Sequence, residues 1–290
     1  MGRRVSTRAL AVLAAGLLLA LGLQACSSDD NKPVSLTVTA SDQSADQFRF
    51  DLPATTDGGV VKIDLKNTSQ QPHELQLVHV KDGTSPDQLV KDVLDSEGAP
   101  IPDYFLGTAG GVGATAPGAT TTVTQKLDPG TYIYFCSIGD GDAVHYKHGM
   151  LGSIQIKGDK GKGDLPKTDA SVKAHEYGFD FSGLKAGANT VTFENTGQQY
   201  HHALFIPVAP GATFDQAKAA MLAPPDQQTG PPPLDFDKEA GFEVLNPGGK
   251  LVQQSLTLQK GTYVVLCFIN DKAGGPPHFT KGMLQELDIP

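Results

Sequence analysis

Large aromatic side chains, cysteines and positive charges are scarce in this sequence of 290 residues. It has no tryptophan, 7% aromatic residues and three cysteines, against 33 glycines and 20 prolines. This composition is typical of a turn-rich β protein rather than a helical one. The 23 lysines and arginines face 32 acidic residues, for a net charge of -9. Contacts to phosphate need clustered basic side chains, so the composition argues against a nucleic-acid partner.

Long hydrophobic runs are also lacking, with one exception at the N-terminus. The run Ala9–Leu23 has 15 residues, fewer than the roughly 20 that a helix needs to span a bilayer. Arginines at positions 3, 4 and 8 precede it. A charged start followed by a short apolar core is typical of a secretory signal, which we expect over residues 1–25.

The end of this signal carries a second motif. Residues 23–26 read Leu-Gln-Ala-Cys and resemble the bacterial lipobox. The resemblance implies that Cys26 is lipidated and that residues 26–33 form a polar tether. The protein would then be extracytoplasmic (periplasmic) and anchored to the bacterial cell membrane through its N-terminal lipid. The alternative is an ordinary signal peptide in which Cys26 is incidental.

The rest of the chain is an internal repeat, which has to be interpreted before its separate motifs. The segment Gly130–Gly152 contains Gly-Thr-Tyr, then Cys136, His145 and Met150. The segment Gly261–Ile289 carries the same residue types in the same order. Four residues separate His from Met in both copies, while eight and ten residues separate Cys from His.

A second pair of matching segments lies upstream of these two. Residues 67–73 read Asn-Thr-Ser-Gln-Gln-Pro-His, and residues 195–201 read Asn-Thr-Gly-Gln-Gln-Tyr-His. Each is followed by an apolar run. We therefore expect two domains, at 34–157 and 168–290, joined by a linker at 158–167 that has no apolar periodicity.

Each repeat offers one thiolate, two imidazoles and one thioether as candidate metal ligands. Soft sulfur ligands combined with imidazole suit copper, and Cys with two His and a weak axial Met is the set used for electron transfer. The candidate sets are His73, Cys136, His145 and Met150 in the first repeat, and His201, Cys267, His278 and Met283 in the second.

Short alternating runs between Gly and Pro turns predict strands throughout both repeats, as in Val34–Thr39. Many closely spaced strands favour an all-β fold with a Greek-key β-sandwich for each repeat. Capping boxes at 85–88 and 213–216 predict one short helix in each.

Two local predictions concern the connections of the first repeat. The Asp-Pro-Gly sequence at 128–130 favours a turn, and we expect residues 121–127 and 132–135 to form a hairpin around it. Residues 98–118 are rich in Gly and Ala, and we expect a long loop there.

The pattern of His, then Gly-x-Tyr-x-x-x-Cys, then His-x-x-x-x-Met resembles the cupredoxins, or blue copper domains, in two tandem copies. The resemblance implies two cupredoxin-like sandwiches, each with a short inserted helix and one type 1 copper held by the four candidates named above. It also implies electron transfer with a redox partner protein that the sequence does not identify. Copper storage or delivery, or ligand binding on the same scaffold, is the alternative.

Two-domain copper oxidases and nitrite reductases are also built from this fold, but we expect no enzyme here. Those enzymes place a His beside the type 1 Cys. The neighbours in this chain are Phe135 and Ser137 in one repeat, and Leu266 and Phe268 in the other. The His-x-His pairs of a trinuclear copper cluster are missing as well.

A second departure concerns the residue after the first His. In the family this residue is commonly Asn, which braces the Cys strand. Here it is Glu74 in the first repeat and His202 in the second. The groups around the ligands should therefore differ from the family pattern.

Several alternatives compete for the candidate residues. Cys136 and Cys267 could pair as a disulfide in an oxidising compartment, or remain as buried inert thiols. Taken alone, the two methionines would be ordinary core residues. His148 competes with His145 but aligns with a lysine in the second repeat. His202 similarly competes with the preceding histidine, whereas His79 and His175 have no partners in sequence and are expected to be structural or exposed.

Overall fold

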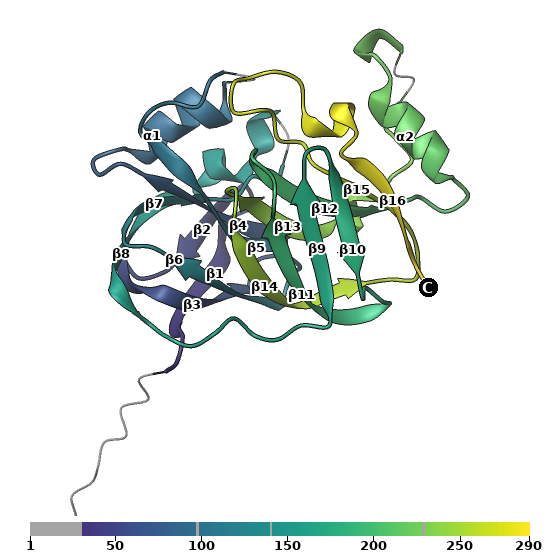
Figure 1. The fold of residues 1–290 in the computed structure, drawn as a ribbon. Helices are drawn as coiled ribbons and strands as arrows, with labels where there is room; N and C mark the ends of the chain where they lie inside the picture. The colour runs from purple at the N-terminus through teal and green to yellow at the C-terminus, as the bar shows by residue number, and fades with distance from the viewer. Residues whose placement is uncertain (1–30, 97–98, 140, 228–229) are drawn as a thin grey trace, which may run out of the picture. The chain divides into compact units, whose positions relative to one another are not determined.

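The computed structural model describes residues 31–290 except 97–98, 140 and 228–229 (Figure 1). The predicted signal peptide, the lipidation site at Cys26 and most of the tether lie outside the described residues. Within the described ranges, no helix has the length and apolar character needed to cross a membrane.

Each repeat contributes eight strands to the part of the chain that is described. The strands of the first repeat are β1 (Val34–Ser44), β2 (Gln47–Asp51), β3 (Thr55–Asn67), β4 (His73–Val80), β5 (Phe105–Thr115), β6 (Thr120–Leu127), β7 (Gly130–Phe135) and β8 (Leu151–Gly161). Those of the second are β9 (Ala170–His175), β10 (Gly178–Ser182), β11 (Gly187–Asn195), β12 (His201–Pro207), β13 (Ala240–Leu245), β14 (Lys250–Leu258), β15 (Gly261–Leu266) and β16 (Leu284–Ile289).

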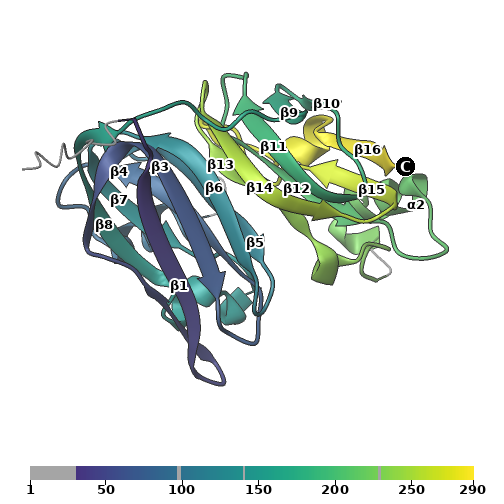
Figure 2. The ribbon, with the colours of Figure 1, turned by 90° about the horizontal axis from the view of Figure 1, so that it is seen from below.

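The two repeats share one topology. The first has sheets ordered β2-β1-β3-β6 and β8-β7-β4-β5, and the second has β10-β9-β11-β14 and β16-β15-β12-β13. In each, the first strand runs parallel to the third. This is the pair of Greek-key sandwiches that the strand pattern predicted, and Figure 2 shows the strands of both.

The predicted hairpin of residues 121–127 with 132–135 is wrong. β6 pairs with β3 and β14, whereas β7 pairs with β4 and β8. The turn at 128–130 instead carries the chain from one sheet to the other. A turn that closes a hairpin and a turn that carries the chain between two sheets have the same residue types, so the local sequence could not distinguish the two arrangements.

The predicted loop over 98–118 is also wrong for most of its length, because residues 105–115 form β5. Its glycines allow backbones to approach closely. A Cβ atom at Gly111 would collide with the carbonyl oxygen of Leu75 on β4, and one at Gly113 with that of Gly241 on β13. The Gly-rich composition therefore marks a crowded strand rather than an irregular segment.

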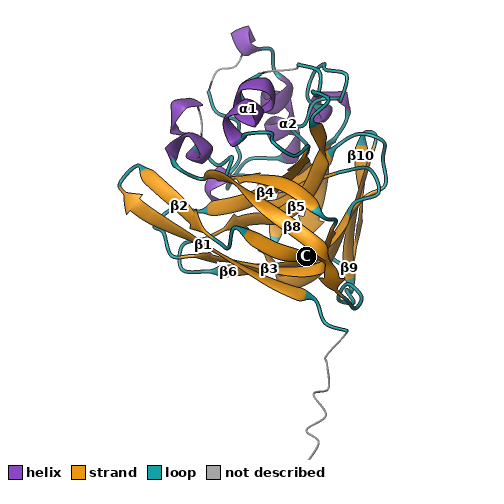
Figure 3. Ribbon diagram, turned by 90° about the vertical axis from the view of Figure 1, so that its left-hand side faces the viewer, coloured by secondary structure: helices purple, strands orange, loops and turns teal. Residues whose placement is uncertain are grey.

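Both predicted helices are present. α1 (Pro86–Leu89) begins after Ser85, whose side chain accepts a hydrogen bond from the backbone of Gln88, and it continues into a π turn over Val90–Leu94. α2 (Phe214–Leu222) begins with a complete capping box. Each helix packs against its own small apolar cluster. Figure 3 shows the helical segments gathered at one end of the strands.

The two repeats are in contact within the described residues. β14 pairs with β6, with Leu251 opposite Gln125. The side-chain oxygen of Gln76 on β4 accepts a hydrogen bond from the backbone of Val244 on β13 at 2.8 Å. β8 continues through Gly161, so the first residues of the predicted linker belong to a strand.

Candidate metal centres

The loop after β7 is folded by backbone hydrogen bonds among three of the candidate ligands. The N–H of Cys136 donates to the carbonyl of Met150 at 3.1 Å, and the N–H of Met150 donates to the carbonyl of His145 at 3.1 Å. The N–H of Tyr146 closes the loop on the carbonyl of Cys136 at 3.0 Å. A loop of eight residues between Cys and His thus returns the imidazole to the thiol.

The loop after β15 repeats this arrangement. Cys267 donates to Met283 at 3.1 Å, Met283 donates to His278 at 3.1 Å, and Phe279 donates to Cys267 at 2.9 Å, all through backbone groups. Its two additional residues between Cys and His leave these bonds unchanged. The equal spacing of His and Met in the two copies therefore reflects one shared turn, which ends at a left-handed glycine in both repeats.

An asparagine folds the loop that delivers the first His of each set. The amide of Asn67 donates to the carbonyls of Gln71 and Thr115, each at 2.7 Å, and its oxygen accepts from the N–H of Ser69 at 2.9 Å. Asn195 makes the three equivalent bonds, to Gln199 at 2.7 Å, to Leu245 at 2.8 Å and from Gly197 at 2.9 Å. The repeated Asn-x-x-Gln-Gln-x-His motif thus codes for a turn that places His at the start of β4 and β12.

The first His/Cys/His group converges on a common point. The Sγ of Cys136 lies 3.5 Å from Nδ1 of His145 and 3.9 Å from Nδ1 of His73. The imidazole centroids are 4.8 Å apart with planes inclined at 58°. Phe48 on β2 packs against both rings.

The second group has nearly the same geometry. The Sγ of Cys267 lies 3.6 Å from Nδ1 of His278 and 4.0 Å from Nδ1 of His201. The ring centroids are again 4.8 Å apart and inclined at 58°. Among the described residues, these two groups are the sets of three or more His, Cys or acidic side chains whose ligand atoms lie close enough to hold one metal ion.

All six of these side chains are buried, with at most 3% exposure. Met150 and Met283 are fully buried in the same core cluster as the two thiols, and their backbones bond to Cys and His as described above. The axial role of the methionine sulfur stays a prediction. The two cysteines are free thiols, so the alternative of a disulfide between them is wrong.

Burial sets the protonation of both groups. It lowers the pKa of His73 and of His201 to about 4, and it lowers that of His145 and His278 as well. It also raises the pKa of both thiols, that of Cys267 to about 12. Four neutral imidazoles therefore present Nδ1 to protonated thiols at neutral pH, so that a metal ion must displace only the thiol proton.

The partners of the outer nitrogens differ between the two groups. In the first, Nε2 of His73 bonds to the hydroxyl of Ser69 at 2.8 Å and Nε2 of His145 lies 3.3 Å from the amide oxygen of Gln71. In the second, Nε2 of His201 donates to the carboxylate of Glu176 at 3.1 Å and Nε2 of His278 to that of Asp271 at 3.0 Å. Neutral partners thus stand in one repeat where carboxylates stand in the other.

The residue after the first His braces the Cys strand in both repeats, by two different chemistries. The carboxyl of Glu74 accepts from the N–H of Ser137 at 3.0 Å and also bonds to its hydroxyl. In the second repeat, Nε2 of His202 accepts from the N–H of Phe268 at 2.7 Å, and burial keeps this imidazole neutral by lowering its pKa to about 3. Glu74 and His202 therefore fill the position expected for Asn in the family.

The competing histidines lie outside the two groups. The ring nitrogens of His148 contact the carbonyls of Asp46 and Asp142, at 2.8 and 2.6 Å. His79 stacks on Tyr132 with a centroid separation of 4.6 Å, and His175 faces Asp180 at 3.8 Å.

The outer partners were not identified from the sequence. Ser69 and Gln71 lie in the repeated Asn–His motif, and Asp271 lies in the Cys–His loop, so their positions carried a signal. Glu176 lies in the connection from β9 to β10, 25 residues before its histidine, and no local pattern pointed to it.

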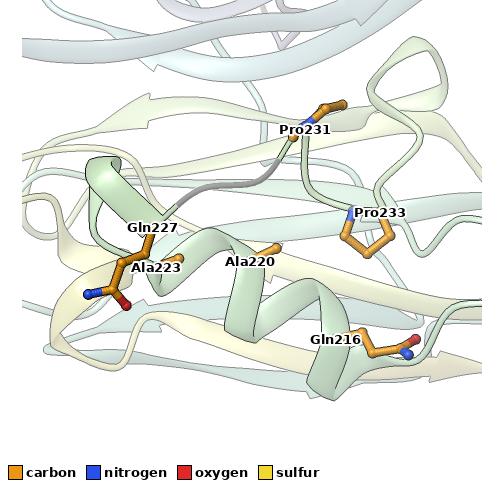
Figure 4. Close-up of a pocket in the computed structure, with 7 residues that line it drawn as sticks. Gln216, Ala220, Ala223, Gln227, Pro231 and Pro233 are labelled. Atoms are coloured by element: carbon orange, nitrogen blue, oxygen red, sulfur yellow. The ribbon is translucent and has the colours of Figure 1, made fainter.

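A surface pocket beside α2 has different chemistry (Figure 4). Its lining consists of Gln, Ala, Gly and Pro residues, including Gln216, Ala220 and Pro233. These side chains offer no thiolate, imidazole or carboxylate, so the pocket is not a candidate metal centre.

No family model matches the sequence, and no curated protein matches it. Among solved structures, the chain is similar to dithionite-reduced auracyanin from Roseiflexus castenholzii, with 20% identity, coverage of 43% of this chain and 98% of that one, and a TM-score of 0.30. It is also similar to a multicopper oxidase (12% identity, 88% of each chain, TM-score 0.25) and to copper nitrite reductase from Nitrosomonas europaea (16% identity, 89% and 94%, TM-score 0.27). Likenesses at these values carry no conclusion about function.

The class of protein follows from the geometry of the chain itself. Each repeat is a cupredoxin-like sandwich, and its buried His, Cys and His side chains place one thiol sulfur and two neutral imidazole nitrogens within 4.8 Å of one another. This soft donor set fits a type 1 copper centre, one in each repeat.

Proposed function

We propose that the protein is an extracytoplasmic, lipid-anchored copper protein that transfers electrons through one type 1 centre in each repeat. The observation that carries this proposal is the convergence of a thiol and two neutral imidazoles, built twice by the same backbone hydrogen bonds. The ligands would be His73, Cys136, His145 and Met150 in one centre, and His201, Cys267, His278 and Met283 in the other.

Bound copper would supply reversible one-electron chemistry between Cu(I) and Cu(II). The residues of the chain would position the ligands. The shared loops would hold three ligands of each set and the asparagine-built turns the fourth, so that the fold rather than the metal would set the ligand positions. Such preorganisation supports electron transfer, because little rearrangement accompanies a change in charge.

The anchor and the partner are parts of the same proposal. Lipidation at Cys26 would hold the two sandwiches near a membrane surface, where a redox partner protein could reach them. An enzyme of the oxidase or nitrite reductase kind is less favoured, because Phe135 and Ser137 flank Cys136 where those enzymes use a histidine.

The experiment is a redox cycle on the purified protein loaded with Cu(II). We expect an intense thiolate-to-copper band in the visible region that ascorbate bleaches and ferricyanide restores over many cycles. Tight binding of Cu(I) without a coloured Cu(II) form would instead indicate storage or delivery. Turnover with nitrite or with phenols would indicate an enzyme.

A further inference from the structure

The two centres form a controlled comparison within one chain. Their sulfur–nitrogen distances agree within 0.1 Å, their ring geometries are the same, and the backbones of their cysteines make the same hydrogen bonds. All six thiol and imidazole side chains are equally buried. Two differences remain. The groups that hold the outer nitrogens of the imidazoles differ, and the Cys strand is braced by Glu74 in the first centre and by His202 in the second.

In the first centre these groups are neutral, a serine hydroxyl and a glutamine amide. In the second they are two carboxylates. Glu176 also accepts hydrogen bonds from the backbone N–H groups of Gln198 and Gln199, at 2.6 and 2.7 Å, which hold it in place. Asp271 is held by the hydroxyl of Tyr177 at 2.7 Å and by an ion pair with Lys281.

A carboxylate bonded to the outer N–H makes an imidazole a stronger donor. Negative charge close to a metal also favours its more positive oxidation state. Both effects stabilise Cu(II) over Cu(I). Lys281 offsets part of the charge of Asp271, so Glu176 should exert the larger effect.

From this asymmetry we infer that the two centres have different reduction potentials, with the second centre, held by Glu176 and Asp271, the lower of the two. The inference rests on the proposed function, because it requires copper at both sites. It also sets the order of reduction: electrons added one at a time occupy the first centre before the second.

Variants that keep only one centre allow the two reduction potentials to be measured separately. Cys136→Ser leaves only the second centre and Cys267→Ser only the first. A spectroelectrochemical titration of each variant, followed through its thiolate-to-copper band, should give a lower potential for Cys136→Ser. We expect at least a tenfold difference in the ratio of oxidised to reduced copper at a common applied potential, which is 59 mV for a one-electron couple.

Charge-only substitutions then test the cause. In the Cys136→Ser background, Glu176→Gln keeps an acceptor oxygen but removes the charge, and it should raise the potential. Asp271→Asn should raise it less, and it serves as the second variant if Glu176→Gln fails to fold. In the Cys267→Ser background, Gln71→Glu should lower the potential of the first centre.

A matched control addresses Glu74, a buried carboxyl near the first centre. Glu74 contacts Ser137 rather than an imidazole, so Glu74→Gln should leave the order of the two potentials unchanged. Two bands with equal or reversed potentials, or potentials that do not respond to Glu176→Gln and Asp271→Asn, would overturn the inference while leaving the proposed function intact. Failure of either single-centre protein to form a band would count against the proposed function instead.

Discussion

At the scale of single residues, each centre depends on groups whose charge is suppressed by burial. The imidazoles are neutral at pH 7 because their pKa values lie below the usual 6.5, and the thiols are protonated because theirs are raised. A metal ion therefore meets two uncharged imidazoles and one S–H bond in each pocket.

This state predicts the proton balance of metal binding. Each copper should release about one proton at pH 7, from the thiol and none from the imidazoles, and the affinity should rise about tenfold per pH unit between pH 5 and 8. Calorimetry in buffers of different ionisation enthalpy measures the release. A value near zero for each copper would show that the thiol does not become a ligand.

Glu74 supports a prediction about the brace of the Cys strand. Glu74→Ala leaves the N–H and hydroxyl of Ser137 without their acceptor, and it should cost about 1–3 kcal/mol in the free energy of unfolding. Glu74→Gln retains an acceptor oxygen and should cost less. Urea unfolding of the metal-free variants measures both, and equal losses would contradict the assigned role.

For single residues, the sequence identified the candidate ligands well and one of their hydrogen-bond partners not at all. The eight candidate ligands could be named because a duplicated spacing singled them out. Glu176 could not, because a hydrogen bond between residues 25 positions apart leaves no periodic pattern. Its partnership with His201 arises only when β9 and β12 are placed by the fold.

At the scale of elements, the turns before β4 and β12 position the first His of each candidate set. Each is organised around one asparagine side chain that makes three hydrogen bonds to the backbone. The first turn carries Ser69, which bonds to Nε2 of His73. The second carries Gln198 and Gln199, whose N–H groups hold Glu176 against Nε2 of His201.

Replacing either asparagine should therefore affect stability and metal binding together. Asn67→Ala removes a buried amide and should cost about 1–3 kcal/mol in the free energy of unfolding, with weaker copper binding at the first centre. The control is Gln70→Ala in the same turn, since this side chain is exposed. A loss of stability without any change in copper affinity would show that the turn does not position the copper site.

The crowded strand β5 gives a second prediction for elements. Gly111→Ala should destabilise the protein by roughly 1–3 kcal/mol beyond its control, because the added Cβ atom meets the carbonyl of Leu75. Gly83→Ala is the matched control, since Gly83 also has a positive φ but no atom within 4 Å of the added Cβ. Equal thermal shifts for the two variants would contradict the close approach.

Sequence patterns predicted the elements better than their pairing. Alternating runs and capping boxes located most strands and both helices, because these depend on local chemistry. The strand β5 was missed because glycine-rich segments lack the apolar alternation that marks strands. The pairing of β6 was mispredicted because its partners, β3 and β14, are distant in the chain.

At the scale of the whole molecule, buried carboxyls lie where the two repeats meet. Glu74 on β4 and Glu243 on β13 are each 7% exposed. Burial raises the pKa of both, and it raises that of Glu239 to about 8. These groups are therefore neutral in the native protein over a range where they are ionised in the unfolded chain.

The sign of their effect on stability follows from this difference. Between about pH 4.5 and 8 the native state binds more protons at Glu239 than the unfolded state, so stability falls as the pH rises through this window. Glu239→Gln should leave stability at pH 5 nearly unchanged and increase it at pH 8. Urea midpoints of metal-free wild type and variant at both pH values test this, and a difference independent of pH would contradict it.

The measurement that tests the central claim most directly is a titration of the metal-free protein with Cu(II), followed through the thiolate-to-copper absorption. The account predicts that the band grows until two equivalents are bound. It also predicts that Cys136→Ser and Cys267→Ser each stop at one equivalent, and that the double variant stays colourless. A band that is complete at one equivalent, or that persists in the double variant, would contradict a copper centre in each repeat.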